Sequence, residues 1–285
     1  MNARRHALIT GGSSGIGKSM ANKLAATGYD ISLIARRPEL LAEAAAEIRR
    51  HAKPGARVAV FPADVAERSQ AEDAVKAAIV AFGPPDMLVT SAGVSEPGYF
   101  ADLTDENFER SMAINFFGTL YVIRAALPSM RARKHGQVVL VSSGAAFMGI
   151  YGYASYGASK FAVRGLGETL RAELRADNIT VTIAYPPDTE TPMLDAEMKI
   201  APPETRAICS VAKTWTADAV ADAVLSGVRR GALGVAPGAT LTLMHRMPGL
   251  ILPLLRWYSD RLVKNVRKAS RPAPMLQPEL GKSFE

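Results

Sequence analysis

The 285-residue chain has a single cysteine, Cys209, and no apolar run long enough to cross a bilayer. One cysteine cannot form an internal disulfide, which fits a protein of a reducing compartment such as the cytoplasm. A membrane-spanning helix needs about 20 consecutive apolar residues, and no stretch reaches that length. Only a short apolar strand follows the basic start, Met1–His6, so no signal peptide is expected.

The charge does not indicate a nucleic-acid-binding protein either. The formal net charge is +7, but most of the excess comes from the eight basic and three acidic residues after Ala239. The body of the chain is nearly balanced and contains no recognised nucleic-acid-binding motif. We therefore expect no nucleic-acid partner.

Short β-rich segments alternate with longer alanine-rich segments over the first two-thirds of the chain. Strands are predicted over His6–Thr10, Asp30–Ala35, Arg57–Phe61, Asp86–Thr90, Gln137–Ser142 and Ile179–Ala184. Helices are predicted over Gly15–Ala26, Pro38–His51, Arg68–Ala81, Ile114–Arg133, Tyr151–Ala176 and Thr216–Arg230. This alternation predicts an α/β fold, a doubly wound parallel sheet of the Rossmann type. We expect one domain over residues 1–239 and a C-terminal extension over residues 240–285, frayed from Ala269.

A glycine-rich turn follows the first predicted strand and opens the first predicted helix. Glycines let backbone N–H groups approach a pyrophosphate, and the helix N-terminus adds a favourable partial positive charge. Many strand–helix turns are rich in glycine for steric reasons alone, but this position favours a dinucleotide. The candidate cofactor residues of the turn are Thr10, Gly11, Ser13, Ser14, Gly15, Ile16 and Gly17.

The end of the second strand indicates which dinucleotide binds. An NAD-binding protein places an acid there, whereas this chain has Ala35 followed by Arg36 and Arg37. A guanidinium pairs with a 2′-phosphate through charge-assisted hydrogen bonds. Alternatively, the two arginines merely begin an exposed helix before Pro38. The register favours NADP(H), with Arg36 as the better candidate.

Tyr156 and Lys160 lie four residues apart, hence on one face of a predicted helix. A nearby cation stabilises a phenolate, so we expect Lys160 to lower the pKa of Tyr156 and make proton exchange feasible. Taken alone, such a pair would more often be a surface contact. Tyr151 and Tyr153 have no lysine four residues later, which leaves Tyr156 as the candidate.

The glycine turn and the Tyr156–Lys160 pair resemble the motifs of the short-chain dehydrogenase/reductase family. The resemblance covers about residues 5–235. It implies hydride transfer from a nicotinamide, a proton from Tyr156, and catalytic roles for Ser143 and Asn115, with no metal. In isolation, Asn115 would be interpreted as a polar residue satisfied within a buried helix. A catalytically silent NADP-sensing or scaffold protein typically loses the tyrosine or the lysine, and both are kept here.

The same resemblance assigns further residues to the cofactor. Asp64 also suits a helix N-cap for the segment near Glu67. Ser91 replaces the family's usual asparagine, and Pro187 replaces a glycine. Because proline lacks an N–H and cannot adopt positive φ, the loop around Pro187 must differ from that of the family. The assigned residues are Asp64, Val65, Ser91, Ala92, Gly93, Pro186, Thr189 and Thr191.

Several strings resemble one branch of the family, the 3-ketodihydrosphingosine reductases. The most telling is Tyr185–Thr191, since it departs from ordinary family members at this place. The branch reduces the 3-keto group of a sphingoid base with NADPH at a membrane, so the resemblance implies a lipid-like substrate. A steroid, a retinoid and a 3-oxoacyl thioester are the alternative substrates.

The C-terminal extension combines the apolar run Leu250–Leu255 and the aromatic Trp257 and Tyr258 with several basic residues. A basic amphipathic helix with such aromatics can lie on an anionic membrane surface. The alternatives are a solvated tail, a helix packed over the active site, and a contact within a homo-oligomer. We expect a cytoplasmic protein, peripheral on the cytoplasmic membrane face through residues 240–270.

Overall fold

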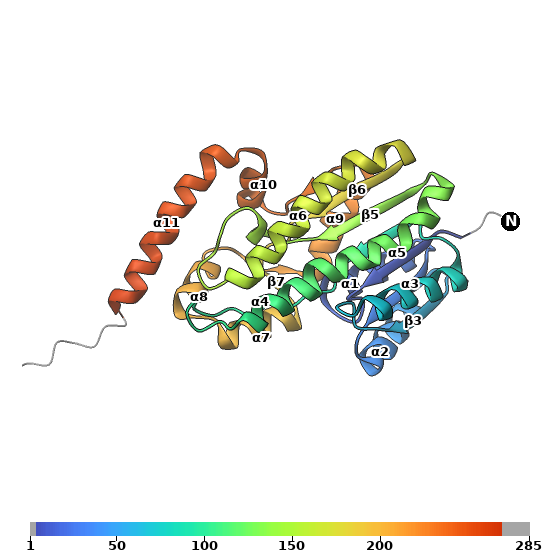
Figure 1. Ribbon diagram of the computed structural model, residues 1–285, viewed down its shortest axis with the longest axis horizontal. Helices are drawn as coiled ribbons and strands as arrows, with labels where there is room; N and C mark the ends of the chain where they lie inside the picture. The colour runs from blue at the N-terminus through green and yellow to red at the C-terminus, as the bar shows by residue number, and fades with distance from the viewer. Residues whose placement is uncertain (1–3, 270–285) are drawn as a thin grey trace, which may run out of the picture.

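A parallel sheet forms the centre of the computed structural model, which describes residues 4–269 (Figure 1). Its strands within this range are β1 His6–Thr10, β2 Asp30–Ala35, β3 Val58–Pro62, β4 Met87–Thr90, β5 Gly136–Val141, β6 Ile179–Ala184 and β9 Gly234–Val235. The order across the sheet is β3-β2-β1-β4-β5-β6-β9, so the winding reverses between β1 and β4. The doubly wound parallel sheet predicted from the sequence is confirmed.

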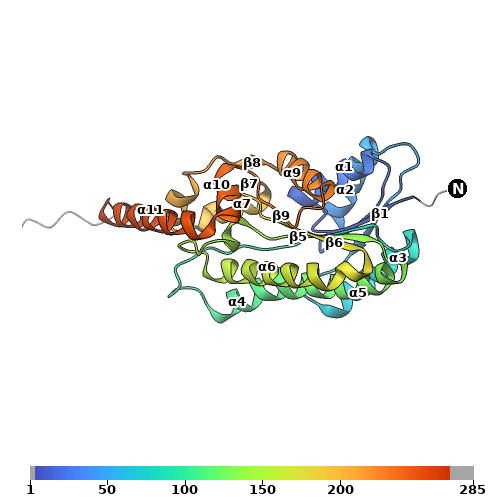
Figure 2. The same ribbon diagram turned by 90° about the horizontal axis from the view of Figure 1, so that it is seen from above.

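Helices cover both faces of the sheet (Figure 2). One face carries α1 Gly15–Ala26, α2 Pro38–His51 and α9 Ala217–Arg229, and the other carries α3 Arg68–Phe82, α5 Gly118–Arg133 and α6 Ala154–Leu174. The strands β1, β2, β4, β5 and β6 are therefore buried on both sides, which explains their continuous apolar sequences. In β1, for example, Ala7 and Ile9 face one core and Leu8 faces the other.

Two predicted helices begin three or four residues later in the structure than predicted. A helix was expected to begin at Ile114, but this residue lies in a π-helical turn, η1 Met112–Phe117. The turn follows α4, Asp105–Ser111, and α5 begins after it at Gly118. The helix expected from Tyr151 begins at Ala154 because Gly152 has a φ of 82°, which a right-handed helix cannot contain.

Short elements that the sequence did not indicate cover the carboxyl edge of the sheet. Strand β7, Thr189–Glu190, pairs in parallel with β8, Trp215–Thr216. Helices α7, Pro192–Ile200, and α8, Pro203–Cys209, lie between these two strands in the chain. The register of a two-residue strand depends on long-range pairing, so local sequence does not reveal it.

Two helices follow the last strand, α10 Ala239–Arg246 and α11 Pro248–Ala269. Helix α11 contacts α8 and lies at the edge of the molecule (Figure 1). Pro248 begins the helix, whereas Pro253, inside α11, costs one backbone hydrogen bond and does not end it. None of the helices in residues 4–269 is long and apolar enough to span a membrane. Residues 270–285, predicted to be frayed, lie outside the described residues.

Candidate active site

The loops after strands β1 to β6 converge at the carboxyl edge of the sheet and enclose a cavity of about 430 Å³. Ligands of doubly wound proteins bind in this place, at the reversal of strand order. Thr10, Gly17 and Asn115 are the predicted site residues that do not line the cavity. Those that line it are Gly11, Ser13, Ser14, Gly15, Ile16, Arg36, Arg37, Asp64, Val65, Ser91, Ala92, Gly93, Ser143, Tyr156, Lys160, Pro186, Thr189 and Thr191.

The glycine turn brings backbone to the cavity wall at Gly11 and Gly15. Gly11 and Gly15 have φ of 66° and 53°, a region that favours glycine. Helix α1 begins at Gly15 after Ser14, whose side chain makes no capping hydrogen bond, and its first turn contains no acidic residue. An uncapped helix N-terminus of this kind suits an anionic group such as a pyrophosphate.

Thr10 and Gly17 shape the turn from behind. The Oγ1 atom of Thr10 accepts hydrogen bonds from the N–H groups of Ser91 (3.2 Å) and Ala92 (3.3 Å), which joins the turn to the loop after β4. A Cβ on Gly17 would lie 2.5 Å from the carbonyl oxygen of Gly11. The structure therefore places these two predicted cofactor residues in the support of the turn.

Arg36 and Asp64 line the cavity beyond the ends of β2 and β3. The side chain of Arg36 is 52% exposed, and its Nη1 lies 3.8 Å from Oδ2 of Asp64. Asp64 does not cap α3, since that helix begins at Arg68 after its N-cap Glu67. Instead, Oδ1 of Asp64 accepts a hydrogen bond from the N–H of Ala66 (3.0 Å). The long Arg36–Asp64 pairing leaves the guanidinium available to an anion.

Asn115 lies in the π-helical turn with its side chain bonded to protein. Its Oδ1 accepts from the N–H of Val94 (2.8 Å), and its Nδ2 donates to the Val94 carbonyl (3.0 Å) and to Ser159 Oγ (2.8 Å). With an exposure of 1%, it matches the description of a satisfied polar residue in a buried helix. Through these bonds it joins the loop after β4 to α6, the helix that carries Tyr156 and Lys160.

Three of the four predicted catalytic side chains meet beyond the end of β5. The Oγ atom of Ser143 accepts a hydrogen bond from the N–H of Ala145 (3.1 Å), and Ser143 is also hydrogen-bonded to Tyr156. The Nζ atom of Lys160 lies 5.6 Å from the centre of the Tyr156 ring and donates to the Val141 carbonyl (3.1 Å).

Burial governs the titration of this pair. It raises the pKa of Tyr156, and the carboxylate of Glu197 raises it further, while the hydrogen bond with Ser143 lowers it. Burial also lowers the pKa of Lys160 to about 8. The expectation of a lowered pKa for Tyr156 is therefore wrong for the protein alone, because burial disfavours the phenolate and raises the pKa. Tyr156 holds its proton at neutral pH.

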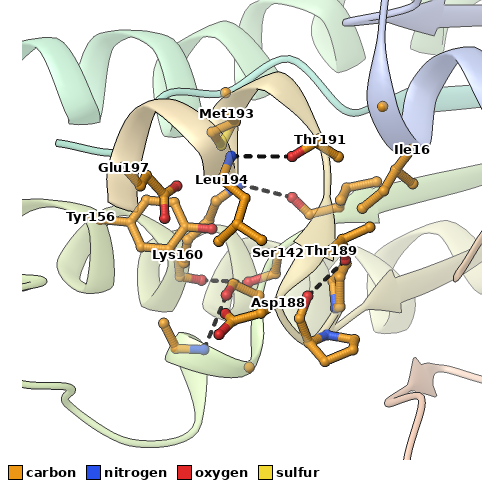
Figure 3. A pocket seen from close by; sticks show the side chains of 18 of the residues that line it. Ile16, Ser142, Tyr156, Lys160, Asp188, Thr189, Thr191, Met193, Leu194 and Glu197 are labelled. Carbon is orange, nitrogen blue, oxygen red and sulfur yellow. Dashed lines mark hydrogen bonds between the residues drawn. The ribbon is translucent and has the colours of Figure 1, made fainter. Parts of the chain in front are cut away.

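Thr189 in β7 and Thr191 at the start of α7 follow β6 and lie close to the glycine turn (Figure 3). Thr189 Oγ1 donates to the carbonyl of Pro187 (2.7 Å), and Thr191 Oγ1 caps α7 by accepting from the N–H of Leu194 (3.3 Å). A Cβ on Gly15 would lie 2.8 Å from Cγ2 of Thr191. The proline-containing loop thus packs directly against the start of α1.

Sequence reasoning missed two acidic residues of the cavity, Asp188 and Glu197. Asp188 follows β6, and Glu197 is on α7 with an exposure of 7%. Figure 3 shows the Glu197 carboxylate next to the ring of Tyr156, and Tyr153 donates its hydroxyl hydrogen to Oε2 of Glu197 at 2.8 Å. Burial raises the pKa of both carboxyl groups. Asp188 lies within the Tyr185–Thr191 run but was given no role there, and Glu197 belongs to no spacing motif.

The far end of the cavity is apolar. Helix α11 forms part of its wall, and Arg267 ties this helix to Glu204 of α8 (Nε–Oε1, 3.2 Å) and to the Tyr151 hydroxyl (2.9 Å). This arrangement matches the alternative of a helix packed over the active site. The apolar lining residues are Met148, Ile150, Ile208, Val211, Leu241, Met244, Leu255 and Leu262.

Residues 5–200 match the family described as short chain dehydrogenase. The chain belongs to this family. This dehydrogenase is 42% identical over 228 residues to a 3-ketodihydrosphingosine reductase of Bos taurus, covering 79% of this chain and 69% of that one. A 3-dehydrosphinganine reductase of Danio rerio is 40% identical over the same shares of the two chains. The family recognised in the sequence and its class, oxidoreductase, are confirmed.

Solved structures give the same result. Levodione reductase superposes with a TM-score of 0.73 and 28% identity, over 79% of this chain and 90% of that one. An alcohol dehydrogenase from the archaeon Thermococcus sibiricus, complexed with 5-hydroxy-NADP, superposes with a TM-score of 0.69 and 25% identity, over 79% and 91% of the two chains.

Proposed function

We propose that this dehydrogenase reduces the 3-keto group of 3-ketodihydrosphingosine, a long-chain amino ketone, with NADPH. The observation that carries the proposal is a cavity with Tyr156 and Lys160 at a polar end and an apolar lining at the other. An amphiphilic ketone matches this distribution, with its carbonyl at Tyr156 and its alkyl chain toward α11. The names of the relatives support the same substrate.

The residues of the cavity fit NADP(H). The uncapped N-terminus of α1 suits the pyrophosphate, and Arg36 suits a 2′-phosphate because no carboxylate ends β2. A Cβ on Gly11 would lie 2.7 Å from the backbone of Ser91, so the turn depends on glycine to keep its backbone at the cavity wall. The neighbour complexed with 5-hydroxy-NADP supports this choice.

Bound NADPH supplies a hydride to the carbonyl carbon. Tyr156, protonated at neutral pH, donates its proton to the carbonyl oxygen, and Ser143 hydrogen-bonds the same oxygen. The ammonium of Lys160 stabilises the phenolate that remains after the proton has left. Asn115 positions the loop after β4 against α6.

The Tyr156→Phe variant tests the chemistry. It keeps the ring and loses the hydroxyl, so we expect NADPH binding within about twofold of the wild type and turnover reduced by at least ~10²-fold. Retained turnover would exclude Tyr156 as the proton donor. NADPH oxidation measured side by side with 3-ketodihydrosphingosine, a steroid ketone and a 3-oxoacyl thioester tests the substrate. Preference for either of the last two contradicts the proposal.

We also propose that residues 240–270 bind a membrane through the outer face of α11. Leu250, Leu254 and Trp257 are 59%, 61% and 62% exposed, at a spacing that places them on one helix face. The same helix carries several lysines and arginines and one acid, Asp260. Exposed apolar and aromatic side chains beside basic ones suit the surface of an anionic bilayer. The inner face of α11 lines the cavity, so a lipid substrate would have a short path from the bilayer.

Sedimentation with phosphatidylserine-containing vesicles tests this extension. A double variant, Leu254→Glu with Trp257→Glu, should lose most of its vesicle binding because it places two carboxylates against an anionic, apolar surface. The control is Val80→Glu, since Val80 is 87% exposed on α3, away from α11. Equal sedimentation of all three proteins contradicts membrane binding. A change in molar mass by light scattering in the double variant alone would indicate a homo-oligomer contact instead.

A further inference from the structure

Glu197 is a buried acid in the cavity that the catalytic steps above do not use. It lines the cavity on α7, and its exposure of 7% leaves little contact with water. Its Oε2 accepts a hydrogen bond from the hydroxyl of Tyr153 (2.8 Å). Within residues 4–269, no lysine, arginine or histidine forms an ion pair with this carboxylate.

The charges of the cavity at this end do not balance. Lys160 is its buried cation, whereas Asp188 and Glu197 are both carboxylic acids. The pKa of Glu197 is raised, first by burial and also by the negative charge of Asp188. With all three groups ionised the site lacks one positive charge. A buried carboxylate without a cationic partner is costly, and a ligand cation removes that cost.

The position of Glu197 relative to Tyr156 decides where such a cation would lie. The carboxylate is next to the phenol ring in Figure 3, and it acts electrostatically on both Tyr156 and Lys160. The substrate carbonyl binds at the Tyr156 hydroxyl under the proposed function. In 3-ketodihydrosphingosine the amino group is on the carbon adjacent to that carbonyl. The ammonium therefore enters the cavity at the same end as Glu197.

We propose that Glu197 binds the ammonium of the substrate and selects α-amino ketones over ketones that lack the amine. This inference rests on the proposed function. It assigns Glu197 a role in specificity. A steroid ketone or a 3-oxoacyl thioester has no ammonium, so its binding would leave the buried carboxylate of Glu197 without a cation. Rejection of a ligand that leaves a buried polar group unpaired is a strong source of selectivity.

The test compares kcat/KM for a soluble short-chain 3-keto-2-amino alcohol with kcat/KM for the same ketone without the amine. We expect the wild type to prefer the amino ketone, and Glu197→Gln to reduce that preference by roughly 10- to 100-fold, the effect of a charge-assisted hydrogen bond. Glutamine keeps an oxygen that can accept from Tyr153, so the packing of α7 is retained. The control is Glu190→Gln, an exposed carboxylate before α7, which should keep the wild-type preference.

Two further measurements separate recognition from a structural role. Tyr153→Phe removes the hydrogen bond to Glu197 but leaves its charge, so we expect the preference for the amine to survive. Equal loss in Tyr153→Phe and Glu197→Gln would mean that Glu197 only supports α7, and would overturn the inference. In the wild type, the amino alcohol product should inhibit at least 10-fold more strongly than the alcohol without an amine. This measurement does not depend on the folding of any variant.

The failure of the two proposals can be told apart. If the wild type reduces neither the amino ketone nor 3-ketodihydrosphingosine, the proposed function is wrong and the inference falls with it. If the wild type reduces both ketones of the pair equally well, or Glu197→Gln keeps the wild-type preference, the proposed function stands and the role of Glu197 is refuted.

Discussion

Replacement of Lys160 by methionine should abolish activity and yet stabilise the folded protein at neutral pH. Lys160 is 6% exposed, and burial lowers its pKa from the usual 10.5 to about 8. At ~1.4 kcal/mol per pKa unit, this difference means that the ammonium costs the folded state about 3 kcal/mol. Methionine has a similar length and no charge. It loses the hydrogen bond that Nζ donates to the Val141 carbonyl, worth about 1 kcal/mol.

The net gain expected for Lys160→Met at pH 7 is therefore about 2 kcal/mol, or on the order of 5 °C in Tm for a chain of this size. The gain should depend on pH in one direction. Below pH 8 the lysine is charged in both the folded and the unfolded protein, so the wild type bears the full cost. Between pH 8 and 10.5 the folded lysine loses its proton first, and wild-type stability rises. The advantage of the variant should therefore shrink and reverse by pH 10.5.

Thermal unfolding without added nucleotide, at pH 7 and at pH 10, measures this effect. The control is Lys76→Met, because Lys76 is 64% exposed and pairs with Asp73 at the surface. It should change stability by less than about 0.5 kcal/mol at both pH values. A Lys160→Met variant that is no more stable than the wild type at pH 7, or whose advantage is the same at both pH values, refutes this account of the buried ammonium.

Two other substitutions test the nucleotide-binding end of the cavity. Arg36→Asp replaces the cation proposed for the 2′-phosphate with an anion, so the ratio of kcat/KM for NADPH to that for NADH should fall by at least ~10-fold; an unchanged ratio assigns the phosphate to other residues. Gly17→Ala places a Cβ 2.5 Å from the Gly11 carbonyl oxygen, so we expect a loss of about 1–3 kcal/mol of stability together with weaker NADPH binding. A wild-type Tm and a wild-type Kd in that variant would show that the turn relaxes without cost.

Local sequence predicted most of the sheet and of the helices around it. The strands β1, β2 and β6 and the helices α1 and α2 begin and end at the predicted residues. The reason is that each is either a short apolar run or an alanine-rich helical segment between recognisable turns, and burial on both faces of a parallel sheet preserves that contrast. Where a prediction was wrong, as at Ile114 and Tyr151, a π-helical turn or a glycine of positive φ changed the boundary.

The candidate site likewise has residues that local sequence predicted and residues that only the folded structure shows. Tyr156, Lys160 and the glycine turn could be found by spacing because the residues of each motif are neighbours in the chain. Glu197 could not, since only the folding of the chain brings α7 to the cavity beside Tyr156, and nothing in its local sequence differs from a surface helix. For α11 the sequence left several roles open, and the tertiary structure shows that this helix contributes part of the cavity wall.

The sequence by itself determined the family, the doubly wound sheet and the chemistry expected of Tyr156, because these depend on short motifs and on local periodicity. Only the tertiary structure decided how readily Tyr156 and Lys160 gain or lose a proton. Burial, which no spacing reveals, raises the pKa of Tyr156 and lowers that of Lys160. Folding also brings Glu197 to the same end of the cavity. Sequence spacing does not reveal these effects, because desolvation and charge interactions depend on distance in space and not on separation along the chain.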